Sequence, residues 1–226
     1  SPGPAAVLQS LSQPLQTASR QLRMSLTLVA IFLAATVALL LVEHWRGHTA
    51  LNLNLKLKGD IKRESWWVQQ YGQAVCTCVA GLLVWRLDPL DSGSKAVTVV
   101  LCVALTSVAC AILKRLFGRV RPGRENAGKF LGPALHASDS HRESFPSSHT
   151  AGAVALTTAL ATLYPQAAAV WWSLAIACAL LRYVLDAHWP SDITAGAATG
   201  YAVAQAGLVC VPPVFNVVYR FALAHL

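Results

Sequence analysis

Between Lys114 and Asp192 the chain holds three short polar segments set among apolar stretches. Their sequences are KRLFGRVRP (114–122), FPSSH (145–149) and RYVLDAHWPSD (182–192). Ionisable groups beside or inside a membrane are costly, so by default they indicate a functional site. Together the segments supply cations, two imidazoles, hydroxyls and a carboxylate. Phosphoryl transfer needs such a set, because cations hold the phosphate oxygens and offset the charge of the transition state.

The third segment places His188 and Asp192 four residues apart, with Pro190 between them. Proline is favoured at the first position of a helix. A helix that begins near Pro190 would bring the Asp192 carboxylate within reach of His188, just upstream. A carboxylate on one imidazole nitrogen fixes the tautomer and raises the basicity of the other nitrogen. The pair therefore suits a nucleophile or a general base.

The second segment, Pro146-Ser147-Ser148, is typical of a helix start, with a serine as the N-cap. His149 would then lie in the first turn. Free backbone N–H groups at such a helix end bind phosphate readily. A histidine in that position can give a proton to a departing oxygen.

Three cations fall at the ends of apolar stretches on the same side of the predicted bundle: Lys114, Arg121 and Arg182. Arginine matches phosphate oxygens with two parallel N–H groups, and lysine adds a point charge. For other arginines, among them Arg119 and Arg124, the plainer interpretation is anchoring to lipid headgroups. No acidic cluster suited to magnesium lies near these segments, so we predict neither a metal nor a cofactor.

The composition indicates a membrane protein. The chain is 55% hydrophobic and 12% charged, with a mean hydropathy of +0.49, whereas soluble domains carry about 25% charged residues. Its formal net charge of +8 favours an anionic partner. In an apolar chain that partner is lipid or phosphate rather than nucleic acid.

We predict an all-α fold in which six transmembrane helices form one bundle, with a short interfacial helix near Trp66 and Trp67. A polar N-terminal segment covers 1–23, and the six-span domain covers 24–226. The expected spans are 24–42, 68–85, 96–112, 150–164, 167–184 and 193–214. Six spans put both termini on one side and all three polar segments on the other. Gly196-x-x-x-Gly200 predicts close helix packing within the bundle.

With these three segments the chain resembles the type 2 phosphatidic acid phosphatase superfamily. The pattern is Lys, six residues, Arg-Pro; then Pro-Ser-x-His; then Arg, five residues, His, three residues, Asp. The matching residues are Lys114, Arg121, Pro122, Pro146, Ser147, His149, Arg182, His188 and Asp192. This chain departs from the family at two positions. Ser148 stands where the family usually has Gly, and Leu181 stands where it often has Ser.

The resemblance implies dephosphorylation of a lipid phosphate without a metal ion, as in phosphatidylglycerophosphate and undecaprenyl-diphosphate phosphatases. It implies that His188 is the nucleophile and forms a phosphohistidine, that Asp192 orients His188, and that His149 is the general acid. The phosphate-binding residues that it implies are Lys114, Arg121, Ser147 and Arg182, with the backbone around Ser148. The substrate headgroup would be selected by the loop 123–144 and the surface near Trp66 and Trp67.

Two alternatives remain open at this stage. One is a phosphotransferase that passes the phosphoryl group from the histidine to another hydroxyl. The other is a non-catalytic protein that binds or moves anionic lipids. The sequence does not choose among phosphatidate, phosphatidylglycerophosphate, polyprenyl diphosphate and lipid A phosphates, nor does it give the oligomeric state.

The orientation in the membrane follows from two observations that disagree. The resemblance implies a bacterial inner-membrane protein with its site on the periplasmic face. Yet thirteen of the 18 lysines and arginines lie on the site side, and five lie on the side of the termini. The positive-inside rule would place the site in the cytoplasm. We expect the periplasmic face, because a phosphate site needs cations and long loops weaken the rule.

Overall fold

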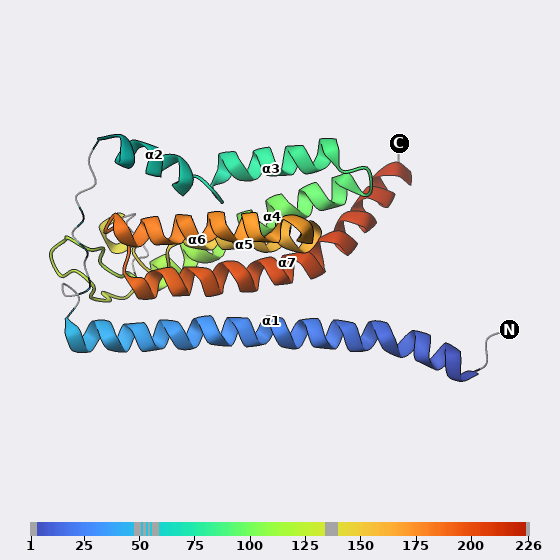
Figure 1. The fold of residues 1–226 in the computed structure, drawn as a ribbon, viewed down its shortest axis with the longest axis horizontal. Helices are drawn as coiled ribbons and strands as arrows, with labels where there is room; N and C mark the ends of the chain where they lie inside the picture. The colour runs from blue at the N-terminus through green and yellow to red at the C-terminus, as the bar shows by residue number, and fades with distance from the viewer. Residues whose placement is uncertain are drawn as a thin grey trace.

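The computed structural model describes residues 4–47, 51, 53, 55, 59–133 and 140–224. Over these residues the chain forms helices joined by turns and one long loop (Figure 1), which confirms the all-α class. The helices are α1 (Pro4–Arg46), α2 (Gly59–Gln69), α3 (Ala74–Leu87), α4 (Ser92–Phe117), η2 (Ser140–Arg142), α5 (Ser148–Leu163), η3 (Pro165–Ala167), α6 (Ala168–Val184) and α7 (Pro190–Ala224).

Helix α5 lies at the centre of the bundle. It packs against α4, α6 and α7, and its residues from Thr150 to Leu160 are buried. Gly196 and Gly200 of α7 allow this packing, because an added Cβ at Gly200 would lie 2.2 Å from the carbonyl oxygen of Ala151. The Gly-x-x-x-Gly pattern therefore serves packing within the chain, as expected.

Among the residues that the structure describes, four helices are long and apolar enough to cross a membrane: Arg23–Arg46 within α1, Ser92–Phe117, Pro165–Val184 and Pro190–Tyr219 within α7. The shorter helix α3, with 14 residues, is also apolar. Helix α5 has 16 residues and is enclosed by its neighbours. The chain is thus a multi-pass integral membrane protein.

The structure divides the expected span 68–85 into two helices. Val68 and Gln69 end α2, residues 70–73 turn, and α3 begins at Ala74. The turn holds Gly72 at φ +79°, where an added Cβ would lie 2.2 Å from the backbone nitrogen of Ala153. The break therefore lets the chain pass directly against α5. Tryptophans 66 and 67 of α2 are exposed, as the expected interfacial helix requires.

Both termini lie at one end of the bundle, and the α4–α5 and α6–α7 connections lie at the other (Figure 1). Helices α5 and α7 begin two or three residues before their expected spans, and α1 and α4 end four or five residues after theirs, all toward this second end. Helix α1 continues to Arg46 and so includes Glu43, and α4 continues to Phe117 and so includes Lys114. Both side chains are thereby held on helices rather than in loops.

Candidate active site

Backbone hydrogen bonds join the three polar segments at the end of the bundle away from the termini. The Ser147 N–H donates to the carbonyl oxygen of Asp192 at 2.9 Å, which ties the second segment to the third. The Ser144 N–H donates to the carbonyl oxygen of Arg119 at 3.0 Å, which ties the loop before α5 to the first segment. Residues more than 70 positions apart therefore share one site.

His188 is 2% exposed, and its ring is held by a main-chain group. Its Nδ1 lies 2.8 Å from the carbonyl oxygen of Ser144. A carbonyl oxygen can only accept a hydrogen bond, so Nδ1 carries the proton. The lone pair of the neutral ring therefore sits on Nε2, which is the form that a nucleophilic imidazole needs.

The Asp192 carboxylate supports His188 less directly than expected. Its Oδ2 lies 3.7 Å from Nδ1 of His188, beyond hydrogen-bond distance. The same oxygen accepts the Ser144 hydroxyl at 2.6 Å and the Trp189 N–H at 2.9 Å. Asp192 thus acts on the ring by charge and by holding Ser144, whose carbonyl contacts the ring.

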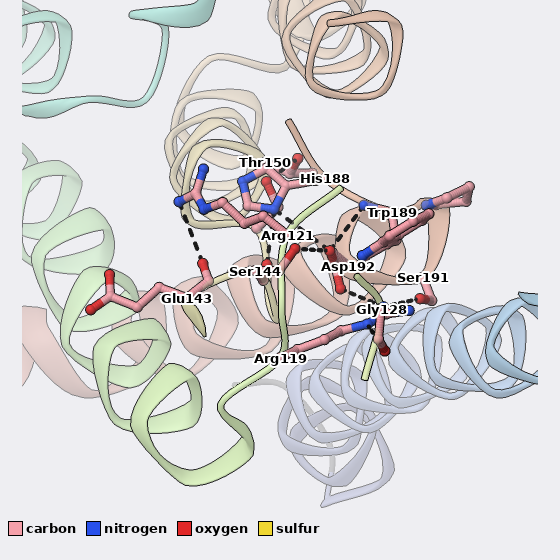
Figure 2. Close-up of polar contacts among 12 residues, drawn as sticks. Arg119, Arg121, Gly128, Glu143, Ser144, Thr150, His188, Trp189, Ser191 and Asp192 are labelled. Atoms are coloured by element: carbon pink, nitrogen blue, oxygen red, sulfur yellow. Dashed lines mark hydrogen bonds and ion pairs between the residues drawn. The ribbon is translucent and has the colours of Figure 1, made fainter. Parts of the chain in front are cut away.

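A buried ionic network lies behind Asp192. The Arg119 guanidinium donates from Nη1 to Asp192 Oδ1 and to the Ser191 hydroxyl, both at 2.6 Å, and from Nη2 to Glu43 Oε2 at 2.6 Å. Arg119, Glu43 and Asp192 are each fully buried. The interpretation of Arg119 as a headgroup anchor was therefore wrong, because its side chain points into the protein. Figure 2 shows Arg119 reaching Ser191 and Asp192 beside the blue ribbon of α1.

Two arginines of the predicted phosphate site carry unused donors. Arg121 donates from Nη2 to the carbonyl oxygen of Glu143 at 3.4 Å, and Arg182 donates from Nη1 to Gln69 Oε1. Within the described part of the chain, Nε of both arginines is buried and has no hydrogen-bond partner. Lys114 lies within electrostatic range of Arg121 and Asp192. Figure 2 shows the side chains of Arg121 and His188 next to each other.

The start of α5 differs in one detail from the expected cap. Ser147 occupies the N-cap position, but its hydroxyl makes no capping hydrogen bond and instead accepts from Thr150 Oγ1 at 3.1 Å. The Ser148 hydroxyl lies against Cys110. His149 lies within electrostatic range of Arg182 and His188, and also of Lys114 and Arg121. The structure therefore brings His149 close to His188 and to the cations of the first and third segments.

The environment of His188 keeps its imidazole neutral. Burial lowers the pKa of His188 from 6.5 to about 4, and the Asp192 carboxylate opposes this shift only in part. The nearby guanidinium groups of Arg182 and Arg121 lower the pKa further. At neutral pH the ring is uncharged, so the Nε2 lone pair is available.

Sequence reasoning missed the residues that form the buried hydrogen-bond network around Asp192: Glu43, Arg119, Ser144 and Ser191. One signal was present, because Glu43 is the sole acidic residue between Met24 and Arg46. An acid at the end of a membrane span indicates a buried partner. His136 and Asp139 of the long loop lie outside the described residues. Over the ranges that the structure describes, it places no group of three metal-ligating side chains together.

The chain is similar to known proteins in sequence and in fold. The sequence model of one family, described as the PAP2 superfamily, matches residues 95–215, which contain all three polar segments. A lipid A 1-phosphatase of Rhizobium johnstonii is 34% identical over 98 residues, which are 43% of this chain and 40% of that protein. A lipid A 1-phosphatase of Porphyromonas gingivalis is 34% identical over 89 residues, which are 38% of this chain and 20% of that protein.

The chain thus matches less than half of the length of these curated relatives. A similar solved structure is the transmembrane PAP2 type phosphatidylglycerolphosphate phosphatase of Bacillus subtilis. It superposes with a TM-score of 0.52 at 15% sequence identity, covering 81% of this chain and 93% of that chain. This last similarity shows a shared fold.

Proposed function

The chain belongs to the PAP2 superfamily, and from this premise we propose that it hydrolyses a lipid phosphate or diphosphate through a phosphohistidine on His188. The observation that carries the proposal is the buried His188 ring, whose Nδ1 is fixed as the protonated nitrogen by the Ser144 carbonyl. The two arginines that act electrostatically on this ring, Arg121 and Arg182, each keep a buried Nε–H that has no partner among the described residues. A nucleophile beside unpaired cationic donors suits a phosphate monoester.

In the first step, Nε2 of His188 attacks phosphorus, and the bond between phosphorus and the lipid oxygen breaks. The new N–P bond gives the ring a positive charge, which the Nδ1–H shares with the Ser144 carbonyl and the Asp192 carboxylate. Lys114, Arg121 and Arg182 hold the phosphate oxygens, with help from Ser147 and the backbone N–H of Ser148. Three cations there supply the charge stabilisation that magnesium gives in other phosphoryl transfers. The reaction therefore needs no metal.

His149 handles the protons of both steps. In its protonated form it gives a proton to the departing lipid alkoxide. In its neutral form it then takes a proton from the water that attacks phosphorus and breaks the N–P bond. This second step releases phosphate and returns His188 to the neutral state. His149 lies within electrostatic range of His188, so it is close enough to serve both steps. The negative charge of a bound phosphate would favour its protonated form.

The catalytic domain covers residues 24–226 and crosses the bilayer six times. The six spans are the four long apolar helices together with α3 and α5. A helix of 14 or 16 residues extends about 21–24 Å, short of a full bilayer core. Helix α5 tolerates this length because other helices surround it. The site faces the periplasm from the inner membrane.

The substrate is a phosphorylated lipid, and the names of the relatives order the candidates to be tested. Lipid A carrying a 1-phosphate and phosphatidylglycerophosphate come first, followed by phosphatidate and a polyprenyl diphosphate. The purified protein is assayed for phosphate release from each lipid in detergent micelles containing EDTA, with His188→Gln as the blank. We expect release from at least one lipid and none from the variant. Release that depends on added metal, or that persists in His188→Gln, would contradict the proposal.

A further inference from the structure

Helix α1 buries two of its described side chains between Arg23 and Arg46, and both are polar. They are Thr36 and Glu43, which are 5% and 0% exposed. Seven positions separate them, so they lie two turns apart on one face of the helix. Both reach α7: Thr36 Oγ1 donates to Thr194 Oγ1 at 2.9 Å, and Glu43 contacts Ser191. The apolar remainder of this stretch is largely exposed.

Glu43 holds the start of α7 at two points. Its Oε1 accepts the Ser191 backbone N–H at 3.0 Å, and its Oε2 accepts the Ser191 hydroxyl at 2.6 Å. The Ser191 N–H is one of the first N–H groups of α7, which have no partner within the helix. A carboxylate from α1 therefore caps the helix whose first turn carries Asp192.

The same carboxylate also orients Asp192 through Arg119. Because Nη2 of Arg119 is fixed on Glu43, Nη1 is directed at Asp192 Oδ1, and Nε lies 3.3 Å from the carbonyl oxygen of Gly128. Asp192 in turn holds the Ser144 hydroxyl, and the Ser144 carbonyl fixes the His188 ring. An unbroken chain of contacts thus leads from α1 to the imidazole.

The charges of this network favour the reaction of His188. Two carboxylates and one guanidinium leave a net charge of −1 on the Nδ1 side of the ring. Phosphorylation at Nε2 makes the ring positive, so the excess negative charge stabilises the intermediate. Without the Glu43 charge, Arg119 would neutralise Asp192. The network would then have no net charge with which to stabilise the positive ring.

We propose that Glu43 is a positioning residue of the active site, which sets the orientation and the effective charge of Asp192 through Arg119. This inference rests on the proposed phosphatase reaction. Glu43 lies on α1, outside the residues 95–215 that match the family model. The site of this protein is therefore incomplete without helix α1.

The test compares Glu43→Gln with Thr36→Val in the purified full chain. The matched control removes the other polar α1–α7 contact from the same face but leaves the ionic network intact. For Glu43→Gln we expect kcat to fall roughly 10- to 100-fold, with KM and the inhibition constant of vanadate within about 3-fold of the wild type. Thr36→Val should keep kcat within about 2-fold. A purely structural role for Glu43 would not produce this separation of kcat from KM.

Arg119→Lys is the second variant, because lysine keeps the charge but lacks the planar fork whose Nη1 and Nη2 contact the two carboxylates separately. It should lower kcat in the same way, and the double variant Glu43→Gln/Arg119→Lys should be little worse than either single variant. The proposal is overturned if folded Glu43→Gln keeps the wild-type kcat, if Thr36→Val loses as much, or if neither Glu43→Gln nor Arg119→Lys folds. An inactive wild type would instead refute the proposed function, and the positioning role with it.

Discussion

Ser144 contributes two different groups to the site. Its carbonyl oxygen contacts Nδ1 of His188, and its hydroxyl donates to Asp192. The carbonyl sets which ring nitrogen bears the proton, whereas the hydroxyl links that carbonyl to the carboxylate. A substitution at Ser144 removes the hydroxyl and keeps the carbonyl. It therefore tests the link to Asp192 without disturbing the contact between the carbonyl and the His188 ring.

Asp192→Asn should lower kcat by about 100-fold or more, because every neighbour of the carboxylate is a hydrogen-bond donor. The amide of asparagine would turn N–H groups toward one of these donors. It would also leave Arg119 paired with the Glu43 carboxylate alone. KM should change little. The measurement is steady-state phosphate release with the best lipid found.

Ser144→Ala is the matched control for this variant. It keeps the carbonyl contact with His188, so we expect a loss of less than about 10-fold in kcat. If Asp192→Asn lost no more activity than Ser144→Ala, the charge of Asp192 would have no special part in the reaction.

The depressed pKa of His188 makes the stability of the fold depend on pH. Between its ordinary pKa of 6.5 and the folded value of about 4, the unfolded chain binds a proton that the folded chain excludes. Stability therefore falls as the pH drops through this range, by up to about 1.4 kcal/mol per pH unit for this single group. The His188→Gln variant lacks the effect.

Thermal unfolding in detergent at pH 7 and pH 5 measures this difference. We expect the melting temperature of the wild type to drop further on acidification than that of His188→Gln. Equal drops in the two proteins would mean that His188 is not held neutral.

The residues that we propose to bind phosphate could be found from the sequence because their spacing is local within each segment. Lys114, Arg121, His149, Arg182 and His188 all lie at the site in the structure. Glu43 and Arg119 escaped prediction because their pairing is tertiary: 76 positions separate them. An arginine near a span end has the same sequence signature whether it binds headgroups or a buried acid. Only the fold distinguishes the two.

At the scale of elements, the contact between α5 and α7 positions the second and third segments against each other. Gly196 permits the contact nearest the site, since an added Cβ there would lie 2.6 Å from the carbonyl oxygen of Ser147. Gly200 permits the next contact, one turn further along α7. Backbone atoms oppose both glycines, so neither position can adapt to a larger residue by rotating a side chain.

Gly200→Ala should destabilise the protein by about 1–3 kcal/mol, because its methyl group would overlap the Ala151 carbonyl. The melting temperature in detergent measures the loss. Gly93→Ala in α4 is the control, because its nearest neighbour is Phe215 Cζ at 3.4 Å, an ordinary contact. An equal effect of the two substitutions would show that the α5–α7 contact is looser than described.

The division of 68–85 into α2 and α3 illustrates where prediction of elements fails. Gln69, Gln70 and Gln73 make the segment around Gly72 polar, but the apolar residues that follow favoured a single span beginning at Val68. The break follows from the approach of Gly72 to the α5 backbone, a contact between parts of the chain some 80 positions apart. By contrast, the long and mainly apolar stretches of α1, α4, α6 and α7 made those helices predictable.

At the scale of the whole molecule, the termini and the site lie at opposite ends of the bundle (Figure 1). The proposed orientation then exposes the α4–α5 loop to the periplasm and the α3–α4 turn to the cytoplasm. Most of the lysines and arginines then lie on the periplasmic side. This is the opposite of the positive-inside rule, which places them in cytoplasmic loops. Several of them lie at the site: Arg119 contacts two carboxylates, and others are the proposed phosphate-binding residues.

Single cysteines introduced on each side test this orientation. Glu125→Cys lies in the exposed α4–α5 loop, and Leu90→Cys lies in the exposed α3–α4 turn. In spheroplasts a membrane-impermeant maleimide should label Glu125→Cys, and it should label Leu90→Cys only after the membrane is broken. The unsubstituted protein serves as the blank for its own cysteines. The reverse pattern would place the site in the cytoplasm.

The central claim is that a phosphoryl group passes through the imidazole of His188. The direct measurement is rapid quenching of the purified protein with a ³²P-labelled lipid phosphate, followed by mapping of the label. We expect an acid-labile, alkali-stable phosphohistidine at His188, formed before phosphate is released and missing from His188→Gln. Turnover without any labelled protein, or a label on another residue, would contradict the account.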